Sequence, residues 1–322
     1  MRDITNPLKV IEMLADGEFH SGEELANVFG ITRAGINKYI KQIREWGIDL
    51  TSLQGRGYCL HAPLDLLNQA KIQHYYHDDK HSQLALDVIP VIHSTNQYLL
   101  DQVHELTSGQ ACVAEFQESG RGRRGRQWFS PFGSNLYFSM YWRLEQGPLA
   151  AMGLSLVIGI VVADVLRELS GKNIKVKWPN DLYLNDKKLA GILVEIIGKT
   201  GDCAHIVLGI GINISMHKPD QQMVNQAWAN LGNINRNLLV AKLLSALRNA
   251  LITFEQQGLA AFIHRWNPLD NFIDRPVKLL IGEKTVIRGI AKGINEQGAL
   301  MLAHDGKITP YIGGEISLRP DQ

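Results

Sequence analysis

The segment at residues 120–128, GRGRRGRQW, is the feature of this 322-residue chain that most restricts its fold. Its glycines have the G-x-G-x-x-G spacing of a dinucleotide-binding turn, which must follow a strand and open a helix. The preceding ACVAEFQ fits a strand, but the following QWFSPFGSNLYF contains Pro131 and Gly133 and then strand-like residues. A doubly wound nucleotide-binding fold is therefore not expected, and the P-loop pattern G-x-x-x-x-G-K-[ST] occurs nowhere in the sequence.

The same segment predicts a flexible loop that holds an anionic ligand. Its arginines are Arg121, Arg123, Arg124 and Arg126. Glycine lets a backbone approach a ligand closely, and the guanidinium group matches the oxygens of carboxylates and phosphates. A mobile solvated loop is the ordinary alternative, but the flanking Trp128 and Phe129 would be poor choices for it. Such a loop suits a reaction in which two anions must meet.

Composition and charge indicate a globular protein of the cytoplasm. Hydrophobic residues make up 45% and charged residues 20% of the chain, which allows a sizeable core. The net charge of +1 excludes a general polyanion binder, so a nucleic-acid contact must come from a local patch. Cys59, Cys112 and Cys203 are far apart and form no C-x-x-C motif, which argues against disulfides and zinc and fits a reducing compartment.

The sequence predicts neither a signal peptide nor contact with a membrane. The start, MRDITNPLKV, lacks an apolar signal core. The longest uncharged run, residues 148–163, is rich in Gly, Ala and Ser and is shorter than the roughly 18 strongly apolar residues of a membrane span. We expect a buried helix there, at about residues 149–169.

The first 60 residues predict a winged helix-turn-helix. Ser21 and Glu24 form an S-x-x-E capping box at the start of a short helix that Gly30 ends. Thr32 can cap a second helix at residues 33–46, whose outer face is basic. The expected DNA contacts on that face are Arg33, Asn37, Lys38 and Lys41.

The following IDLTSLQGRGYCL fits two short strands around residues 54–57, which would form the wing. A solvated amphipathic hairpin without DNA-binding activity is the alternative. DNA binding is favoured because the cap, the turn, the basic face and the wing agree with one another.

Changes in composition and hydrophobic pattern divide the chain into four parts. We expect a DNA-binding domain at residues 1–62, a polar linker, partly helical, at 63–83, a mixed α/β domain at 84–270 and a small all-β unit at 271–322.

The mixed domain combines strands with long helices. Strands are expected at residues 111–117, 134–144, 173–181, 187–198 and 204–215, and helices at about 149–169 and 238–257. The strand at 204–215 is apolar on both faces and should be central in its sheet. A further helix begins near Ser94 or Thr95, either of which can serve as its N-cap.

Several motifs together resemble the biotin protein ligase family. The similar segments are STNQ, EFQESGRGRRGRQWFSPFGSNLYFS, KVKWPNDLY, KKLAGILVE and GIGINI, in the same order and spacing. The helix-turn-helix resembles the bifunctional bacterial type, which combines the ligase with the biotin operon repressor. The resemblance implies an α+β fold, in which a catalytic domain related to class II aminoacyl-tRNA synthetases lies between a winged helix-turn-helix and an SH3-like β-barrel.

The resemblance also implies the reaction. The family makes biotinyl-5′-adenylate from biotin and ATP with Mg²⁺, then passes biotin to a lysine of the biotin carboxyl carrier protein. A carboxylate must attack a phosphate while both are negative, which positioning and charge neutralisation can achieve without a Ser or Cys nucleophile. No tightly bound cofactor is expected. The adenylate would also act as corepressor by favouring a homodimer on operator DNA.

The family's biotin contacts can be carried over residue by residue. The matching positions are Ser94, Thr95, Asn96, Gln117, Arg121, Gly122, Arg123 and Lys188. Arg123 and Lys188 would be the catalytic residues, because they would neutralise charge at the carboxyl–phosphate junction. Helix capping by Ser94 and Thr95, and an exposed turn lysine at 188, are the ordinary readings of these residues.

The family's ATP side corresponds to a second set of residues. The matching positions are Lys177, Asn180, Asp181, Asn213 and Trp228. Asp181 is the candidate Mg²⁺ ligand, since Mg²⁺ at phosphates takes few protein ligands. Trp228 would pack on adenine, with an ordinary core tryptophan as the alternative.

The sequence leaves two other functions open. The first is a non-enzymatic repressor whose central domain senses a dinucleotide through the glycine motif. The second is a lipoate ligase on the same catalytic fold.

Overall fold

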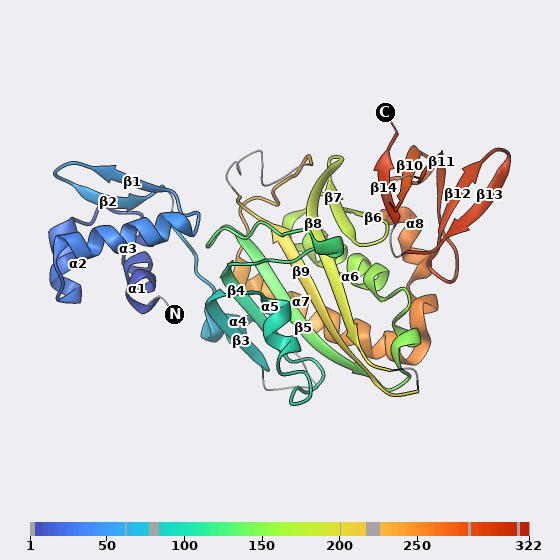
Figure 1. Cartoon of the computed structure of the whole chain (residues 1–322), viewed down its shortest axis with the longest axis horizontal. Helices are drawn as coiled ribbons and strands as arrows, with labels where there is room; N and C mark the ends of the chain where they lie inside the picture. Colours follow the sequence, from blue (N-terminus) through green and yellow to red (C-terminus); the bar gives the residue numbers. More distant parts are fainter. Residues whose placement is uncertain are drawn as a thin grey trace.

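The computed structural model describes residues 4–61, 63–76, 84–199, 201–216, 226–282, 285–313 and 316–321. The molecule is elongated, with a small helical part at one end, a large central sheet and a small all-β part at the other end (Figure 1). Its α+β class and the order of its three parts agree with the expectation from the sequence.

The N-terminal part is the expected helix-turn-helix with a wing. Its elements are α1 (Thr5–Leu14), α2 (Gly22–Phe29), α3 (Arg33–Glu45), β1 (Leu50–Leu53) and β2 (Gly57–Leu60). The capping box is present, because Ser21 Oγ accepts from Glu24 N and the Glu24 carboxylate accepts from Ser21 N. Gly30 ends α2 at a φ of 61°, a left-handed conformation that favours glycine.

The central part is built on a seven-stranded sheet in the order β3-β4-β5-β9-β8-β7-β6. The strands are β3 (Leu86–Ile92), β4 (Ala111–Gln117), β5 (Asn135–Leu144), β6 (Lys175–Lys177), β7 (Asp181–Leu184), β8 (Lys187–Ile197) and β9 (Ala204–Asn213). β9 lies in the middle, as its apolar sequence predicts. The strand expected at residues 173–181 is interrupted at Trp178 and Pro179, so that β6 and β7 form a hairpin.

Helices cover the sheet unequally. α6 (Leu154–Ser170) and α7 (Arg236–Gln257) pack together on one face and bury its core, while the short α5 (Thr95–Leu100) covers part of the other face. The smaller helices are α4 (Gln69–Tyr75), α8 (Trp266–Leu269), η1 (Arg123–Gly125), η2 (Pro148–Ala151), η3 (Gly258–Ala261) and η4 (Ile263–Arg265). The linker expected at residues 63–83 contains α4, and its residues 77–83 lie outside the described residues.

The two long helices are core helices of this fold. The stretches Pro148–Ser170 and Arg236–Ala261 are long and apolar enough to cross a membrane, but 67% and 61% of their most apolar windows are buried in the protein. The helix expected at about 149–169 begins later, because Gly153 adopts a φ of 81° and separates η2 from α6.

Alternation along the strands gives the sheet two chemically different faces. On β9, the even-numbered isoleucines and Leu208 pack under α6 and α7, while Gly209 and Gly211 point to the opposite face. On β8, Ile192 points into the core, so Gly191 and Glu195 share the second face. The second face of β8 and β9 therefore offers little side-chain volume.

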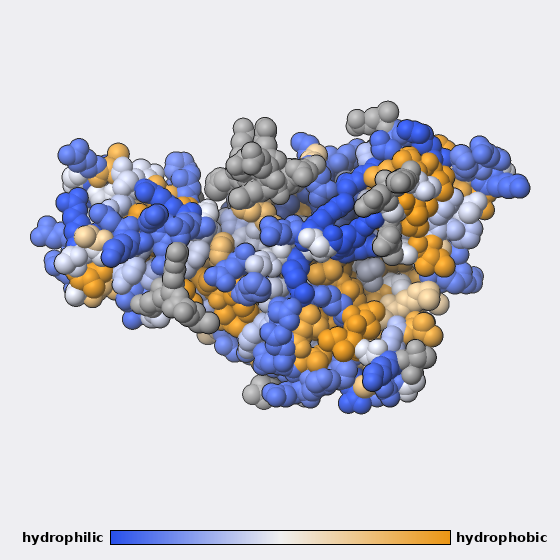
Figure 2. Space-filling view, viewed as in Figure 1, coloured by the Kyte–Doolittle hydropathy of each residue, from blue (hydrophilic) through white to orange (hydrophobic). Residues whose placement is uncertain are grey.

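The C-terminal part is a five-stranded antiparallel sheet in the order β13-β12-β11-β10-β14. Its strands are β10 (Pro276–Ile281), β11 (Thr285–Ile294), β12 (Leu300–His304), β13 (Lys307–Tyr311) and β14 (Ile316–Pro320). Trp178, which is buried, donates from Nε1 to Gly298 O at 3.1 Å and so fastens this part to the β6–β7 hairpin. On the face of the molecule in Figure 2, a strongly hydrophilic area lies between the central and C-terminal parts.

The helix-turn-helix is joined to the central part by an aromatic contact. Trp46, at the end of α3, stacks on Phe132 with ring centroids 5.8 Å apart, and Phe116 lies at 6.2 Å from the same indole. Phe132 is only 2% exposed. The DNA-binding part therefore contacts the segment that follows the arginine loop.

Candidate active site

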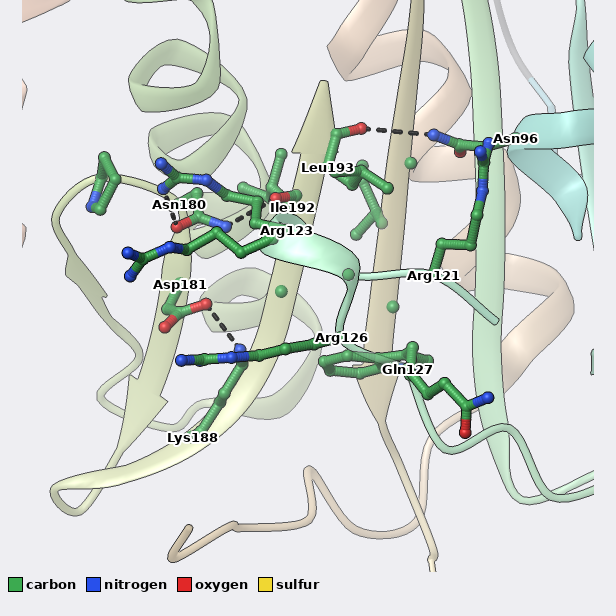
Figure 3. A pocket seen from close by; sticks show the side chains of 18 of the residues that line it. Asn96, Arg121, Arg123, Arg126, Gln127, Asn180, Asp181, Lys188, Ile192 and Leu193 are labelled. Atoms are coloured by element: carbon green, nitrogen blue, oxygen red, sulfur yellow. Dashed lines mark hydrogen bonds and ion pairs between the residues drawn. The ribbon is translucent and has the colours of Figure 1, made fainter. Parts of the chain in front are cut away.

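A pocket opens on the second face of the central sheet and is bordered by four different regions. These are the start of α5, the arginine loop, the turn between β6 and β7, and β14 of the C-terminal part. A neighbouring pocket shares Trp128, Lys188 and Arg319 with the first. The two pockets therefore adjoin and are together called the cavity below; Figure 3 shows side chains that line the first.

Glycines form the floor of the cavity. A Cβ atom at Gly211 would collide with the indole of Trp128, and one at Gly209 would collide with the amide of Asn96. A Cβ atom at Gly191 would lie 3.0 Å from the same indole. The absence of side chains at these positions is what lets the loop and α5 lie directly on the backbone of β8 and β9.

One end of the cavity carries uncharged hydrogen-bonding groups. Thr95 N donates to Gln117 Oε1 at 3.0 Å, and Gln117 Nε2 donates to Ser130 Oγ at 3.0 Å. Ser139 Oγ lies 2.5 Å from Asn96 Oδ1 and 2.7 Å from Thr95 Oγ1. All five side chains are buried, so this end can recognise a polar but uncharged group.

Ser94 supports this polar end from the backbone. Its hydroxyl accepts from Gln97 N at 3.4 Å and caps α5, and the side chain is 2% exposed. Of the two candidate caps, Ser94 is therefore the one used. The cap fixes where α5 starts and so presents Thr95 and Asn96 to the cavity.

The other end of the cavity is cationic and contains one carboxylate. Asp181 Oδ1 lies 2.7 Å from Lys188 Nζ, and Asp181 Oδ2 lies 3.2 Å from Lys177 Nζ. Burial by itself would raise the pKa of Asp181, but the two ammonium groups outweigh it and lower that pKa to about 2. Burial lowers the pKa of Lys177, which Asp181 counteracts. Asp181 is therefore ionised and holds both lysines.

Arg123 lies at this cationic end (Figure 3). Its Nη1 donates to Asn180 Oδ1 at 2.9 Å, and Asn180 Nδ2 donates to Ile192 O at 2.8 Å. Lys188 Nζ also lies 5.4 Å from the centre of the Trp128 ring. Arg123 and Lys188 thus border the same space, which fits an anionic group.

Arg121 lies apart from Arg123 and Lys188. Its side chain points toward Asn96 in Figure 3, and its Nη2 lies 2.7 Å from Glu195 Oε2. Gly122, the next residue, donates from its backbone N to Arg126 O at 2.7 Å and closes the loop. The structure therefore divides the loop arginines between the two ends of the cavity.

The second pocket holds the residues expected near the nucleotide. It is lined by Trp128, Asn213, Met216 and Trp228, with Arg319 entering from β14. Trp228 is half-buried rather than part of the core, and its backbone bridges to Lys188. Asn213 is buried at the end of β9, with Nδ2 3.5 Å from Lys188 O.

Four residues in or beside the cavity are not predicted from the sequence. Arg319 lines it, while Ser130, Ser139 and Glu195 lie behind it and hydrogen-bond to the lining residues Gln117 and Asn96. Glu195 and Ser139 could have been found by extending strand alternation from Gly191 and Tyr137, since each shares its face. No local signal marks Arg319, because it reaches the cavity from another part of the chain.

The donor set at Asp181 does not form a protein-held metal site. Within the part of the chain that the structure describes, no group of three or more His, Cys, Asp or Glu side chains is arranged to hold a metal ion. Both Asp181 oxygens are also engaged by ammonium groups.

The expected DNA contacts lie on the outer face of α3. Arg33, Asn37, Lys38 and Lys41 are all exposed. Asn37 Oδ1 also accepts from Tyr58 of the wing at 2.6 Å, so the helix and the wing hold each other in place.

Comparisons with known proteins agree with this arrangement. The family described as "Biotin/lipoate A/B protein ligase family" matches residues 88–213. An "HTH domain" matches residues 8–59, and a "Biotin protein ligase C terminal domain" matches residues 272–319.

Similar proteins span the whole chain. The "Bifunctional ligase/repressor BirA" of Escherichia coli (strain K12) is 58% identical over 99% of this chain and 99% of that protein, and the protein of the same name in Salmonella typhimurium is equally similar. Among solved structures, the biotin protein ligase from Aquifex aeolicus in complex with biotin and ATP is 29% identical with a TM-score of 0.64, and the match covers 73% of this chain and 99% of that one. The chain therefore belongs to the biotin protein ligase family, in its bifunctional ligase/repressor form.

Proposed function

We propose that this protein activates biotin with ATP as biotinyl-5′-adenylate, transfers biotin to a lysine of the biotin carboxyl carrier protein, and represses transcription with the adenylate as corepressor. The observation that carries the proposal is a cavity with an uncharged hydrogen-bonding end at Thr95 and Gln117 and a cationic end at Lys188. Biotin has the same polarity, with a cyclic urea at one end and a carboxylate at the other.

The cationic end supplies what the first step requires. The biotin carboxylate attacks the α-phosphorus of ATP, a new C–O–P bond forms, and diphosphate leaves. Negative charge is concentrated where the two anions meet, and Lys188 and Arg123 border the space that they would occupy. Asp181 holds the Lys188 ammonium group in place until the substrates arrive, so the group is preorganised rather than recruited.

The second pocket suits the nucleotide. Trp228 offers an aromatic face for the adenine ring, while Lys177, Asn180 and Asn213 provide polar groups toward the phosphates and ribose. Magnesium would enter the site with ATP, because the candidate ligand Asp181 is already paired with two lysines. A contact between Asp181 and this ion would need at least one lysine to move to the phosphates.

The carrier lysine completes the reaction. Its uncharged amine attacks the carbonyl carbon of the adenylate, an amide bond forms, and AMP leaves. The arginine loop, which crosses the cavity, would keep water from this anhydride until the carrier arrives.

Repression is assigned to the N-terminal part. We propose that residues 1–62 bind operator DNA, that 63–83 link them to the catalytic residues 84–270, and that 271–322 complete the nucleotide site. A homodimer formed in the presence of adenylate would present two copies of α3 to a palindrome. We propose the cytoplasm as its location, which fits its free cysteines.

The alternatives have less support. A dinucleotide sensor needs a helix after the glycine motif, whereas this loop continues toward β5. A lipoate ligase shares the catalytic family, but the similar proteins whose names state a substrate are biotin ligases.

Biotin-dependent exchange of labelled pyrophosphate into ATP tests the proposal. We expect exchange with biotin and none with lipoate or without acid. Exchange with lipoate alone would establish the lipoate ligase, and protection by NADH without any exchange would support the sensor.

A further inference from the structure

We propose that Glu195 is a positioning residue for biotin, because it sets the direction of the hydrogen bonds at the uncharged end of the cavity. This inference rests on the proposed function. Glu195 lies on β8, and its Oε2 accepts from Asn96 Nδ2 at 2.8 Å and from Arg121 Nη2 at 2.7 Å. The one carboxylate oxygen therefore contacts two residues that the family resemblance assigns to the ligand.

The contact with Glu195 fixes the orientation of the Asn96 amide. An ionised carboxylate can only accept hydrogen bonds, so the NH₂ group of Asn96 must face Glu195 and its oxygen must face Ser139. Gly209 leaves the amide no free space, because a Cβ atom there would already collide with it. Without Glu195, the Asn96 amide would keep one other acceptor among the described residues on that side, the Leu193 carbonyl at 3.5 Å. A contact of that length would hold the NH₂ group in place only weakly.

The orientation of Asn96 decides where the Ser139 proton goes. The Ser139 hydroxyl has one proton and two oxygen neighbours, Asn96 Oδ1 at 2.5 Å and Thr95 Oγ1 at 2.7 Å. The amide oxygen cannot donate, so it takes the Ser139 proton. The contact between Ser139 and Thr95 is then a hydrogen bond only if Thr95 donates. Thr95 Oγ1 has two acceptors within reach, Ser139 Oγ at 2.7 Å and Gln117 Oε1 at 3.2 Å, and the shorter contact takes its proton. Glu195 thereby favours donation from Thr95 to Ser139 over donation to Gln117.

The result is an acceptor pair for a ligand N–H group. With its proton committed to Ser139, Thr95 Oγ1 presents lone pairs only. Gln117 Oε1 lies 3.2 Å from Thr95 Oγ1 and is the other acceptor that the Thr95 proton could reach. When that proton goes to Ser139, Gln117 Oε1 accepts only from Thr95 N and keeps a lone pair for a ligand, while Gln117 Nε2 donates to Ser130. A cyclic urea carries N–H donors, so it suits two adjacent acceptors, whereas a reversed Thr95 proton would meet one of these oxygens and block it.

Glu195 also neutralises Arg121 and anchors the first part of the arginine loop. The pair is about one-third exposed on the arginine side and 27% exposed on the carboxylate side. Without Arg121, the Glu195 carboxylate would repel an anionic substrate. Without Glu195, the Arg121 side chain would be free to move away from Asn96. The structure therefore gives Glu195 a role in binding biotin and none at the phosphates, which lie at the other end of the cavity.

The test compares E195A, Glu195→Asp and Glu195→Gln by biotin-dependent pyrophosphate exchange. Loss of a partner from a buried donor corresponds to an increase of about ten- to a hundredfold in an equilibrium constant. We expect E195A to raise KM for biotin by about that factor while kcat and KM for ATP stay within about twofold. Glu195→Gln keeps an oxygen that can accept from both donors, so its KM for biotin should be close to that of the unmodified protein. Equal rises in both KM values, or no rise for biotin, would overturn the inference.

A double substitution tests the route through Ser139. If Glu195 acts through Asn96 and Ser139, the E195A/S139A protein should have the same KM for biotin as S139A within about twofold. If KM for biotin in the E195A/S139A protein instead rose by the product of the two single-substitution effects, the route through Ser139 would be contradicted.

The controls separate this inference from the proposed function. Glu168→Ala removes a carboxylate from a surface ion pair with Lys242 and should leave both KM values unchanged. If the unmodified protein shows no biotin-dependent exchange, the proposed function is wrong; if it does and E195A matches it, only the role of Glu195 is wrong. Should E195A fail to fold, Glu195→Asp withdraws the acceptor from Asn96 but keeps the charge, and an unchanged KM for biotin would overturn the inference.

Discussion

Phe132 and Trp46 connect the helix-turn-helix to the segment that follows the arginine loop. Their rings stack with centroids 5.8 Å apart, and Phe132 N donates to Trp46 O at 2.9 Å. Phe132 follows Ser130, which binds Gln117 in the cavity, and Trp46 ends the helix that is expected to read DNA. These two side chains thus bring the segment after the arginine loop into contact with the DNA-binding part, although the two are far apart in the sequence.

The first prediction concerns this contact. Phe132→Ala should lower the free energy of unfolding by about 3 kcal/mol, because a buried phenylalanine is removed from an interface. Urea unfolding should change from one transition to two, as the helix-turn-helix loses its main support on the catalytic part. Val28→Ala, at an apolar residue that is 60% exposed, is the matched control. A single transition at the original midpoint would contradict the coupling.

The second prediction concerns the cover over the adenylate. Arg123→Gly should loosen the loop at the cationic end, release biotinyl-adenylate faster and biotinylate nearby lysines without selection. Arg124→Gly is a matched control, because Arg124 is exposed and already has a φ of 62°. Retention of labelled adenylate on a desalting column measures the effect. Equally slow release from both variants would exclude the role of Arg123.

The third prediction concerns charge stabilisation. Lys188→Ala should reduce the rate of pyrophosphate exchange by about a hundredfold, the usual loss for one preorganised group at a developing charge. Its neighbour Lys187 is exposed, so Lys187→Ala should leave the rate unchanged. Circular dichroism should show that both variants fold. An unaltered rate for Lys188→Ala would remove it from the list of catalytic residues.

The fourth prediction is a pH dependence of stability. The pKa of Asp181 is held at about 2, below its ordinary value of 3.8, so its ion pairs stabilise the folded state above about pH 4. That contribution, about 2 kcal/mol, should be lost as the pH falls toward 2. The difference in unfolding free energy between the original protein and Asp181→Asn should therefore shrink over this range. Asp305→Asn, at an 84% exposed carboxylate, should show no such change.

The fifth prediction concerns regulation. Biotin and ATP together should increase both the sedimenting mass and the affinity for operator DNA, because the adenylate would order the loops at which two subunits pair. Lys41→Ala should weaken DNA binding and reduce its salt dependence by about one ion, while pyrophosphate exchange stays unchanged. Equal mass and equal DNA affinity with and without the two substrates would rule out the adenylate as corepressor.

The helix-turn-helix could be predicted from the sequence because its signals are local. Ser21 and Glu24 lie within one turn of each other, and Gly30 ends α2 through its own backbone angles. The predicted start of this long helix, at about residue 149, is too early. The uncharged run from residue 148 gives no sign of the break at Gly153, after which α6 begins.

The contents of the cavity depended more on distant contacts. The loop arginines can be read from the sequence, but Arg121 pairs with Glu195, which lies on β8 and is 74 residues away along the chain. Arg319 reaches the second pocket only because Trp178 fastens the C-terminal sheet to the β6–β7 hairpin. Such contacts have no signal within a short window of residues.

The glycine floor has a consequence for both activities, because both depend on the same ligand. Gly211 touches no DNA-binding residue, and a single methyl group there would collide with Trp128. An alanine at this position would displace the Trp128 ring, which lines both pockets, without removing a charge or a hydrogen-bonding side chain. The helix-turn-helix would remain on its aromatic support while the ligand that controls it no longer fits. One methyl group would thus remove ligation and ligand-controlled repression together while leaving the DNA-binding surface unchanged.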